Sequence, residues 1–124
     1  MTNAEYKAML EKRTAAFSVA VLRMFPHVPK GVEFANIKDQ LNRSATSVGA
    51  NYREANKAES YNDFAHKFAI AAKEISEAEY WLGLLASLAP EIPGGDDAWR
   101  ESNELMRLFA KTQSTLLKRK SEAG

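Results

Sequence analysis

The chain has 124 residues and a formal net charge of +1, from 17 Lys and Arg residues against 16 Asp and Glu residues. This length suits one domain and not two, so we expect a single domain over residues 1–124. Cysteine is absent, which excludes disulfide bonds, a thiolate nucleophile and a zinc–thiolate site.

The N-terminal residues 1–11 lack the basic segment and following apolar stretch of a signal peptide. The longest apolar run, residues 80–89, is too short to cross a bilayer and contains Gly83 and Ser87. The lack of cysteine also fits a reducing compartment. We therefore expect a soluble, cytoplasmic protein that makes no membrane contact.

The first two predicted helices cover residues 4–25 and 32–58, with Asn3 as the cap of the first. Pro26, Pro29 and Gly31 predict the loop between them. The inner stripe of the second helix is thin, because small and polar residues stand where a plain bundle would place Leu. The predicted inner positions are Tyr6, Met9, Leu10, Arg13, Phe17, Val21 and Met24 in the first helix, and Phe34, Ile37, Leu41, Ala45, Val48, Tyr52 and Ala55 in the second.

The third and fourth predicted helices cover residues 61–89 and 97–120. Ser60 and Asp63 resemble a capping box at the start of the third helix, and Asp96 or Asp97 is expected to cap the fourth. The predicted inner positions are Tyr61, Phe64, Phe68, Ala71, Ile75, Ala78, Leu82 and Leu85, followed by Trp99, Leu105 or Met106, Phe109, Gln113, Leu116 and Leu117. Spacings of three and four with short connections predict an all-α, antiparallel up-down-up-down four-helix bundle.

Charge is unevenly distributed along the chain. Residues 74–104 contain eight acidic residues and a single basic one, Arg100, so the end of the bundle that joins the third and fourth helices should be acidic. The opposite end should be basic, with Tyr6, Tyr52 and Tyr61 nearby to stack or pack. The candidate nucleic-acid-binding residues there are Arg53, Lys57, Lys67, Lys118, Arg119 and Lys120. The alternative interpretation is a solvated helix end whose cations complement the helix dipoles.

The third helix carries more apolar surface than one buried face requires. Ile70, Trp81, Leu84 and Leu88 lie beside its inner stripe, and we expect them to form an oligomer interface. The alternative is a thicker monomer core with scattered apolar side chains at the surface, which is common in monomeric proteins.

Polar residues lie beside the inner stripes of the second and third helices. Carboxylates near a core need hydrogen-bond donors, so we expect a polar network that fixes the helix register. Its members are Arg43, Ser44, Asn51, Glu54, Glu74 and Glu77.

A third hypothesis is a metal-dependent enzyme that uses Asp63, His66, Glu74 and Glu77. A di-metal bundle needs the Glu-x-x-His motif twice, however, and the similar Asp63-x-x-His66 occurs once. No phosphate loop or nucleophile elbow is present either. We therefore expect no metal, no cofactor and no enzymatic activity.

The residues also carry a family resemblance. Residues 41–55, LNRSATSVGANYREA, resemble the bacterial four-helix-bundle proteins named for intervening sequences in 23S ribosomal RNA genes. The third helix is similar at Ser60, Asp63, Phe64, Lys67, Ala71, Lys73, Glu74, Glu77 and residues 79–82. The resemblance implies an antiparallel bundle and a homopentameric ring. A related branch, the accessory protein of diversity-generating retroelements, works with a reverse transcriptase and nucleic acid.

These observations lead to two hypotheses about function. The first is a non-enzymatic, oligomeric bundle that binds RNA or a ribonucleoprotein through its basic end. The second is a protein–protein adaptor ring with no direct nucleic-acid contact. In both, the expected partners are further copies of the chain and either RNA or a nucleic-acid-handling protein.

Overall fold

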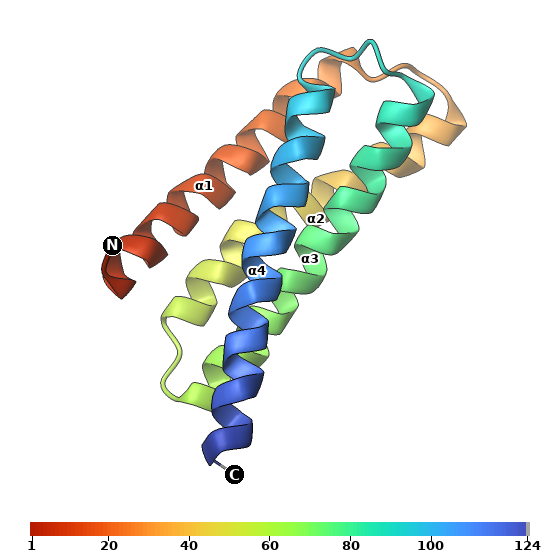
Figure 1. The fold of residues 1–124 in the computed structure, drawn as a ribbon. Coiled ribbons are helices and arrows are strands. Elements are labelled where there is room, and N and C mark those ends of the chain that lie inside the picture. The colour runs from red at the N-terminus through yellow and green to blue at the C-terminus, as the bar shows by residue number, and fades with distance from the viewer. Residues whose placement is uncertain (124) are drawn as a thin grey trace.

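In a computed structural model, which describes residues 1–123, the chain folds into four long helices. They are α1 (Asn3–Met24), α2 (Val32–Asn56), α3 (Tyr61–Leu88) and α4 (Gly95–Ala123), and the short 3₁₀ helix η1 (Phe25–His27) follows α1. Figure 1 shows the four helices running up and down in turn, with both upper connections at one end and the α2–α3 turn at the other. The predicted antiparallel bundle is confirmed, and every helix bound lies within three residues of its prediction.

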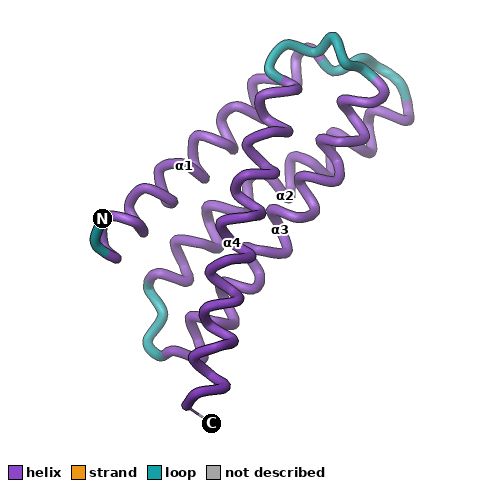
Figure 2. The backbone as a smooth tube through the Cα atoms, viewed as in Figure 1, coloured by secondary structure: helices purple, strands orange, loops and turns teal. Residues whose placement is uncertain are grey.

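The helices pack unequally. Consecutive helices pack against each other and α1 also meets α4, which closes the bundle. The pairing of α2 with α3 is the most extensive, whereas α1 and α4 make the least contact. Figure 2 shows α1 diverging from α4 toward its N-terminus, while the C-terminal turns of α4 extend beyond the other helices. The helix ends near both chain termini are therefore staggered, and this is the open end of the bundle.

The start of α1 differs from its prediction by one residue. Thr2, and not Asn3, is the cap: its hydroxyl accepts a hydrogen bond from the Glu5 N–H at 3.1 Å. The Glu5 carboxylate in turn accepts from the Thr2 N–H at 3.4 Å, which completes a capping box. Asn3 is thereby left as the first helical residue, with its side chain available for contacts elsewhere.

The caps of the later helices agree only in part with the predictions. Ser60 caps α3, because its hydroxyl accepts from the Asp63 N–H at 3.1 Å. The Asp63 carboxylate accepts from the Glu59 N–H, at 3.4 Å, so the second bond reaches one residue before the cap. The prediction that Asp96 or Asp97 caps α4 is wrong, since α4 begins at Gly95 and both lie in its first turn, where a negative charge still suits the helix dipole.

The core follows most of the predicted stripes, with exceptions at Tyr61 of α3 and at Trp99 and Leu117 of α4. Phe17, Phe68 and Phe109 are fully buried, together with leucines from all four helices. In α4 the buried residues before Leu105 are Ala98 and Ser102, whereas the predicted Trp99 lies at the flank and Leu117 is exposed. The Trp99 ring covers Gly83 of α3, where an added Cβ would lie 3.4 Å from Trp99 Nε1.

Small residues bring α1 close to α2. A Cβ built on Gly49 would lie 3.1 Å from Thr14 Oγ1, which is tighter than most packed contacts. One turn away along α1, the Ser18 hydroxyl donates a hydrogen bond to the Ala45 carbonyl at 2.7 Å. The small residues of the 41–55 segment are therefore needed for helix packing, because larger side chains would push α1 away.

Two leucines on α4 provide a test of this packing. Leu105 is fully buried and Leu117 is 69% exposed. Leu105→Ala should lower the free energy of unfolding by ~2–5 kcal/mol, because it removes buried apolar contacts and leaves a cavity. Leu117→Ala should change it by less than ~0.5 kcal/mol. Urea denaturation followed by circular dichroism measures both, and equal losses in the two variants would contradict the observed register of α4.

Candidate functional site

The predicted basic residues lie at the open end of the bundle, where α1 begins, α2 turns into α3, and α4 ends. Two of them are engaged in ion pairs. Lys67 Nζ lies 3.1 Å from Asp63 Oδ2, and Arg53 Nε lies 3.7 Å from Glu11 Oε1. Lys57 and the α4 residues Lys118, Arg119 and Lys120 are exposed. This end therefore presents cations from three helices, as the sequence predicts.

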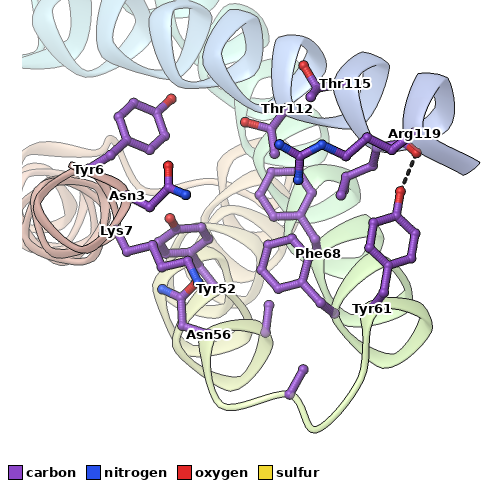
Figure 3. Close-up of a pocket in the computed structure, with 14 residues that line it drawn as sticks. Asn3, Tyr6, Lys7, Tyr52, Asn56, Tyr61, Phe68, Thr112, Thr115 and Arg119 are labelled. Atoms are coloured by element: carbon purple, nitrogen blue, oxygen red, sulfur yellow. Dashed lines mark hydrogen bonds between the residues drawn. The ribbon is translucent and has the colours of Figure 1, made fainter. Parts of the chain in front are cut away.

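A pocket of about 410 Å³ opens at this end, between the start of α1, the α2–α3 turn and the last turns of α4. Figure 3 shows the residues that line it. Tyr52 and Phe68 form its floor and are 2% and 1% exposed. Their ring centroids lie 6.0 Å apart with nearly perpendicular planes, and Phe64 stacks on Phe68 at 5.7 Å. The pocket thus has a rigid aromatic base.

The rim of the pocket is polar and positively charged. Lys7 Nζ lies 5.6 Å from the centroid of the Phe64 ring, within reach of a cation–π interaction. Arg119 reaches the pocket from α4, and Figure 3 shows its guanidinium beside Thr112. Lys7 and Arg119 are the charged members of the lining, and none of the lining residues is acidic. The local field should therefore favour anions, although the whole chain is nearly neutral.

Tyr52 supplies a hydroxyl that stays protonated. Burial raises the pKa of Tyr52 to about 12, and this rise is only partly offset by the neighbouring Asn56 amide. The Asn56 Nδ2 group donates to Glu11 Oε2 at 2.9 Å. Asn56 Oδ1 is buried, and within residues 1–123 it accepts no hydrogen bond. The pocket floor therefore contains polar groups that the protein's own contacts do not fully satisfy.

Tyr61 closes one side of the pocket. It was expected in the core, but its side chain is 40% exposed, because it begins α3 at the end of the bundle. Its hydroxyl donates to the Leu116 carbonyl and so links the start of α3 to the end of α4 (Figure 3). All three tyrosines named from the sequence, Tyr6, Tyr52 and Tyr61, line this pocket.

Sequence reasoning left several lining residues out of the candidate site. Thr112 and Thr115 share the α4 face of Arg119, which the sequence did predict, and their three-and-four spacing was a signal available in the sequence. Asn3 and Asn56 could not be recognised, because they meet only when the start of α1 lies beside the end of α2. A pocket formed by the ends of several helices leaves no compact motif in the chain.

The expected polar network between α2 and α3 is not formed within the described residues. Ser44 is buried, and its hydroxyl donates to the Gln40 carbonyl of its own helix at 3.1 Å. Asn51 Nδ2 likewise donates to the Ser47 carbonyl at 2.8 Å. Arg43 pairs with Asp39 at 3.3 Å on the exposed side of α2. The partners of Ser44, Asn51 and Arg43 therefore all lie within α2. The small residues of the 41–55 segment contribute to helix packing through their size more than through their polarity.

Glu54, Glu74 and Glu77 differ in their surroundings. Glu54 and Glu77 are exposed, whereas Glu74 is partly buried on α3. Burial raises the pKa of the Glu74 carboxyl, and the charge of Glu77 raises it further. Glu74 lies one helical turn from Ile70 along the same flank of α3. In the isolated chain, the surroundings of Glu74 therefore disfavour the charged form of its carboxyl group.

The apolar flank of α3 is only partly covered. Ile70 and Leu88 are 37% and 55% exposed, while Trp81 and Leu84 are partly buried against the core. The Trp81 ring also contacts Tyr80, with centroids 5.0 Å apart. The four predicted interface residues thus form a stripe of mixed exposure along the outside of α3.

The opposite end of the bundle has a different character. A cavity of about 540 Å³ lies there between α1 and α4, lined by small residues such as Ala16 and Ala20 and by charges of both signs. Arg13 and Glu101 tie the two helices together below it through two hydrogen bonds of 2.7 Å. The Glu101 hydrogen bonds raise the pKa of Arg13. Phe17 is the one Phe or Tyr residue in this described lining and both signs of charge are present, whereas the basic-end pocket is lined by five such residues and by cations without carboxylates.

Neither a shared metal site nor a membrane span is found in the described part of the chain. Asp63 pairs with Lys67, and the hydrogen bond from Lys67 lowers the Asp63 pKa. Among residues 1–123, no three carboxylate, imidazole or thiol groups lie close enough to hold one metal ion. Over the same range, each helix falls short of the length and apolar character that crossing a bilayer requires.

Comparison with known proteins identifies the family. The profile described as 23S rRNA-intervening sequence protein matches residues 7–89, more than half of the chain. The chain belongs to this family. A solved structure of a protein of unknown function from the S23 ribosomal protein family of Bacteroides thetaiotaomicron is similar, with 30% identity and a TM-score of 0.71. The match covers 83% of this chain and 96% of that one. No curated protein matches.

The predicted family membership is thereby confirmed. The matched residues 7–89 include most of α1, all of α2 and all of α3, but they end before α4. They contain Lys7, Tyr52 and Phe68 from the basic-end pocket. Thr112, Thr115 and Arg119, which complete its α4 side, lie outside the matched region.

The position of Glu74 predicts a pH-dependent stability. A carboxyl whose pKa is raised on folding favours the folded state below its unfolded pKa, and that contribution is lost as the pH rises. Glu74→Gln should therefore raise the melting temperature at about pH 7, with a smaller gain at about pH 4. Glu54→Gln, at an exposed position on α2, is the control and should show no such pH dependence. Thermal melts at both pH values measure this, and a destabilised Glu74→Gln protein at neutral pH would contradict the assignment.

Proposed function

We propose that this protein is a non-enzymatic, oligomeric four-helix bundle that binds RNA or a ribonucleoprotein through its basic end. The observation that carries the proposal is an aromatic pocket whose described lining contains Lys7 and Arg119 and no carboxylate. It lies at the end of the bundle where Lys57, Lys118 and Lys120 are also exposed. Cations attract the phosphate backbone, and aromatic rings offer stacking surfaces for bases. RNA is found in the cytoplasm, and the lack of cysteine is compatible with that reducing compartment.

The family adds support of a limited kind. Its description associates it with intervening sequences of 23S rRNA, and the similar solved structure is described as a member of the S23 ribosomal protein family with unknown function. Neither description states that the protein binds RNA. The proposal therefore depends on the chemistry of the basic end, and the family associations make RNA the first nucleic acid to test.

Self-association would raise the RNA affinity of the basic end, which is weak in a single copy of the chain. The α3 stripe of Ile70, Trp81, Leu84 and Leu88 offers apolar surface for a neighbouring copy, and we propose a homopentameric ring. Each copy would present the same basic end, so one RNA could contact several patches at once. Linked contacts of this kind raise the overall affinity by large factors without any new type of interaction.

A second candidate function is a protein–protein adaptor ring. The favouring observation is the overall charge of +1, since the acidic end of the bundle offsets the basic one. Acidic groups in the first turns of α4, among them Asp96, Asp97 and Glu101, give a docking surface that RNA would avoid. The two candidates therefore assign the working surface to opposite ends of the molecule.

The RNA proposal is tested by reversing charge at the basic end. The triple variant Arg53→Glu, Lys57→Glu and Lys118→Glu should weaken binding of a structured RNA by at least about tenfold at low salt, since the binding free energy comes mainly from phosphate contacts. Fluorescence polarisation at low and moderate salt measures the affinity. Wild-type binding should itself fall as salt is raised.

The control reverses the same number of charges at the other end. Arg23→Glu, Lys30→Glu and Lys38→Glu lie at or near the α1–α2 connection and change the net charge equally. This variant should retain most of the wild-type affinity. Equal losses in both variants would show that binding follows net charge alone, and no wild-type binding at low salt would remove the nucleic-acid proposal.

Oligomerisation is tested separately. The wild-type protein should have a solution mass that is a multiple of the 13.8 kDa chain mass. The double variant Ile70→Glu and Leu88→Glu should shift it toward the monomer, because charges on the α3 stripe would be buried in the interface. Val32→Glu, at an exposed apolar residue outside the stripe, is the control and should leave the mass unchanged. Multi-angle light scattering measures all three, and a monomeric wild-type protein refutes the ring.

A further inference from the structure

The basic-end pocket combines three features that a simple phosphate-binding patch does not need. It has an aromatic floor, two cations at its rim, and amide and hydroxyl groups from α1, α2 and α4. Phosphate contacts with duplex RNA require only the cations, which could lie on a flat surface. An enclosed aromatic base points to a ligand with an apolar or aromatic part.

The size of the pocket sets an upper limit on that ligand. Its volume of about 410 Å³ lies near the lower end of the range of about 300–1,000 Å³ typical of small-molecule sites. Such a space suits one nucleotide and not a stretch of duplex. Single-stranded nucleotides are the units that RNA-binding proteins most often receive in pockets, because their bases are free to leave the stack.

The aromatic groups are placed to hold a base. Figure 3 shows Tyr6 and Tyr61 on two sides of the pocket, with Phe68 between them at its base. Phe68 is fixed by its contacts with Tyr52 and with Phe109, whose ring centroid lies 5.0 Å away. The floor is therefore rigid but almost fully covered, since Tyr52 and Phe68 are 2% and 1% exposed. A base entering from the open side would contact the more exposed rings of Tyr6, Tyr61 and Phe64, and would lose little free energy to rearrangement of this floor.

The charged and polar groups are suited to the remainder of a nucleotide. Lys7 and Arg119 come from helices on different sides of the opening, so a phosphate between base and solvent would lie in the positive field of both. The Tyr52 hydroxyl, kept protonated by its raised pKa, and the Asn3 amide are available for polar edges of the base or sugar. No carboxylate in the described lining opposes the phosphate.

We propose that this pocket binds one unpaired nucleotide, with its base against the partly exposed rings of Tyr6, Tyr61 and Phe64 and its phosphate facing Lys7 and Arg119. The inference deepens the proposed function and rests on it where the nucleotide belongs to an RNA. A free nucleoside monophosphate offers the same chemistry and is the second source to be distinguished. The larger cavity at the opposite end does not fit this ligand, because Phe17 is the one Phe or Tyr residue of its described lining, which also includes Asp97 and Glu101, and these oppose a phosphate.

The test fills the pocket without changing its charge. Thr112→Phe places a ring in the lining, whereas Ser114→Phe adds the same ring at an exposed α4 position outside it. Circular dichroism and thermal melts check that both variants fold. If Thr112→Phe does not fold, Thr115→Phe, at an exposed lining position, replaces it.

Two kinds of probe separate the sources of the nucleotide. Calorimetry with adenosine and uridine 5′-monophosphates measures the free ligands, with inorganic phosphate as the reference. A single-stranded RNA carrying one 2-aminopurine, alone and annealed to its complement, reports whether a base enters an aromatic site. We expect the mononucleotides to bind at least about tenfold more tightly than phosphate, and Thr112→Phe to remove this advantage while Ser114→Phe retains it.

The outcomes distinguish this inference from the proposed function. A fluorescence change with the single strand, lost in Thr112→Phe and in the annealed duplex, supports both. RNA binding that is equal in wild type and Thr112→Phe, with no fluorescence change and no mononucleotide binding, overturns the pocket inference but leaves the proposed function standing. Mononucleotide binding without RNA binding supports the pocket with a free nucleotide and overturns the proposed function. Absence of binding by every probe overturns both.

Discussion

The close approach of α1 to α2 is the constraint on which the rest of the structure depends. Gly49 leaves room for Thr14, and Ser18 donates to the Ala45 carbonyl, so the two helices meet through small side chains and a direct hydrogen bond. α1 packs less extensively on α4 than on α2, and its N-terminal turns diverge from α4. The pocket lies at that end, above the buried floor of Tyr52 and Phe68.

The distribution of charge gives this opening its chemistry. The chain as a whole is nearly neutral, but the described pocket lining contains Lys7 and Arg119 without a carboxylate. Glu11, which accepts a hydrogen bond from the lining residue Asn56, is also paired with Arg53. The site is therefore locally positive even though the molecule is not, and assembly into a ring would repeat that local field around an axis.

Much of the fold was predictable from the sequence, because the spacing of apolar residues and the positions of Pro and Gly determine where these helices begin and end. In α4 the predictions for Leu105 and Phe109 were right, but Trp99 and Leu117 were wrong, since hydropathy favours Trp99 over the buried Ala98. Polarity in the 41–55 segment suggested a network, whereas Ser44 bonds its own helix and Gly49 serves close packing. The cations and tyrosines of the candidate site were predictable from the antiparallel topology. The pocket itself was not, because it arises only where the ends of the helices fail to meet.

Photo-crosslinking to RNA tests the central claim most directly, since it reports where the nucleic acid lies on the assembled protein. A single-stranded RNA carrying 4-thiouridine should, after irradiation, attach to peptides that contain Tyr6, Tyr52 or Phe68, and excess unlabelled single strand should compete. Crosslinks confined to peptides from the α1–α2 connection and the start of α4 would contradict the account, since those segments form the opposite end of the bundle.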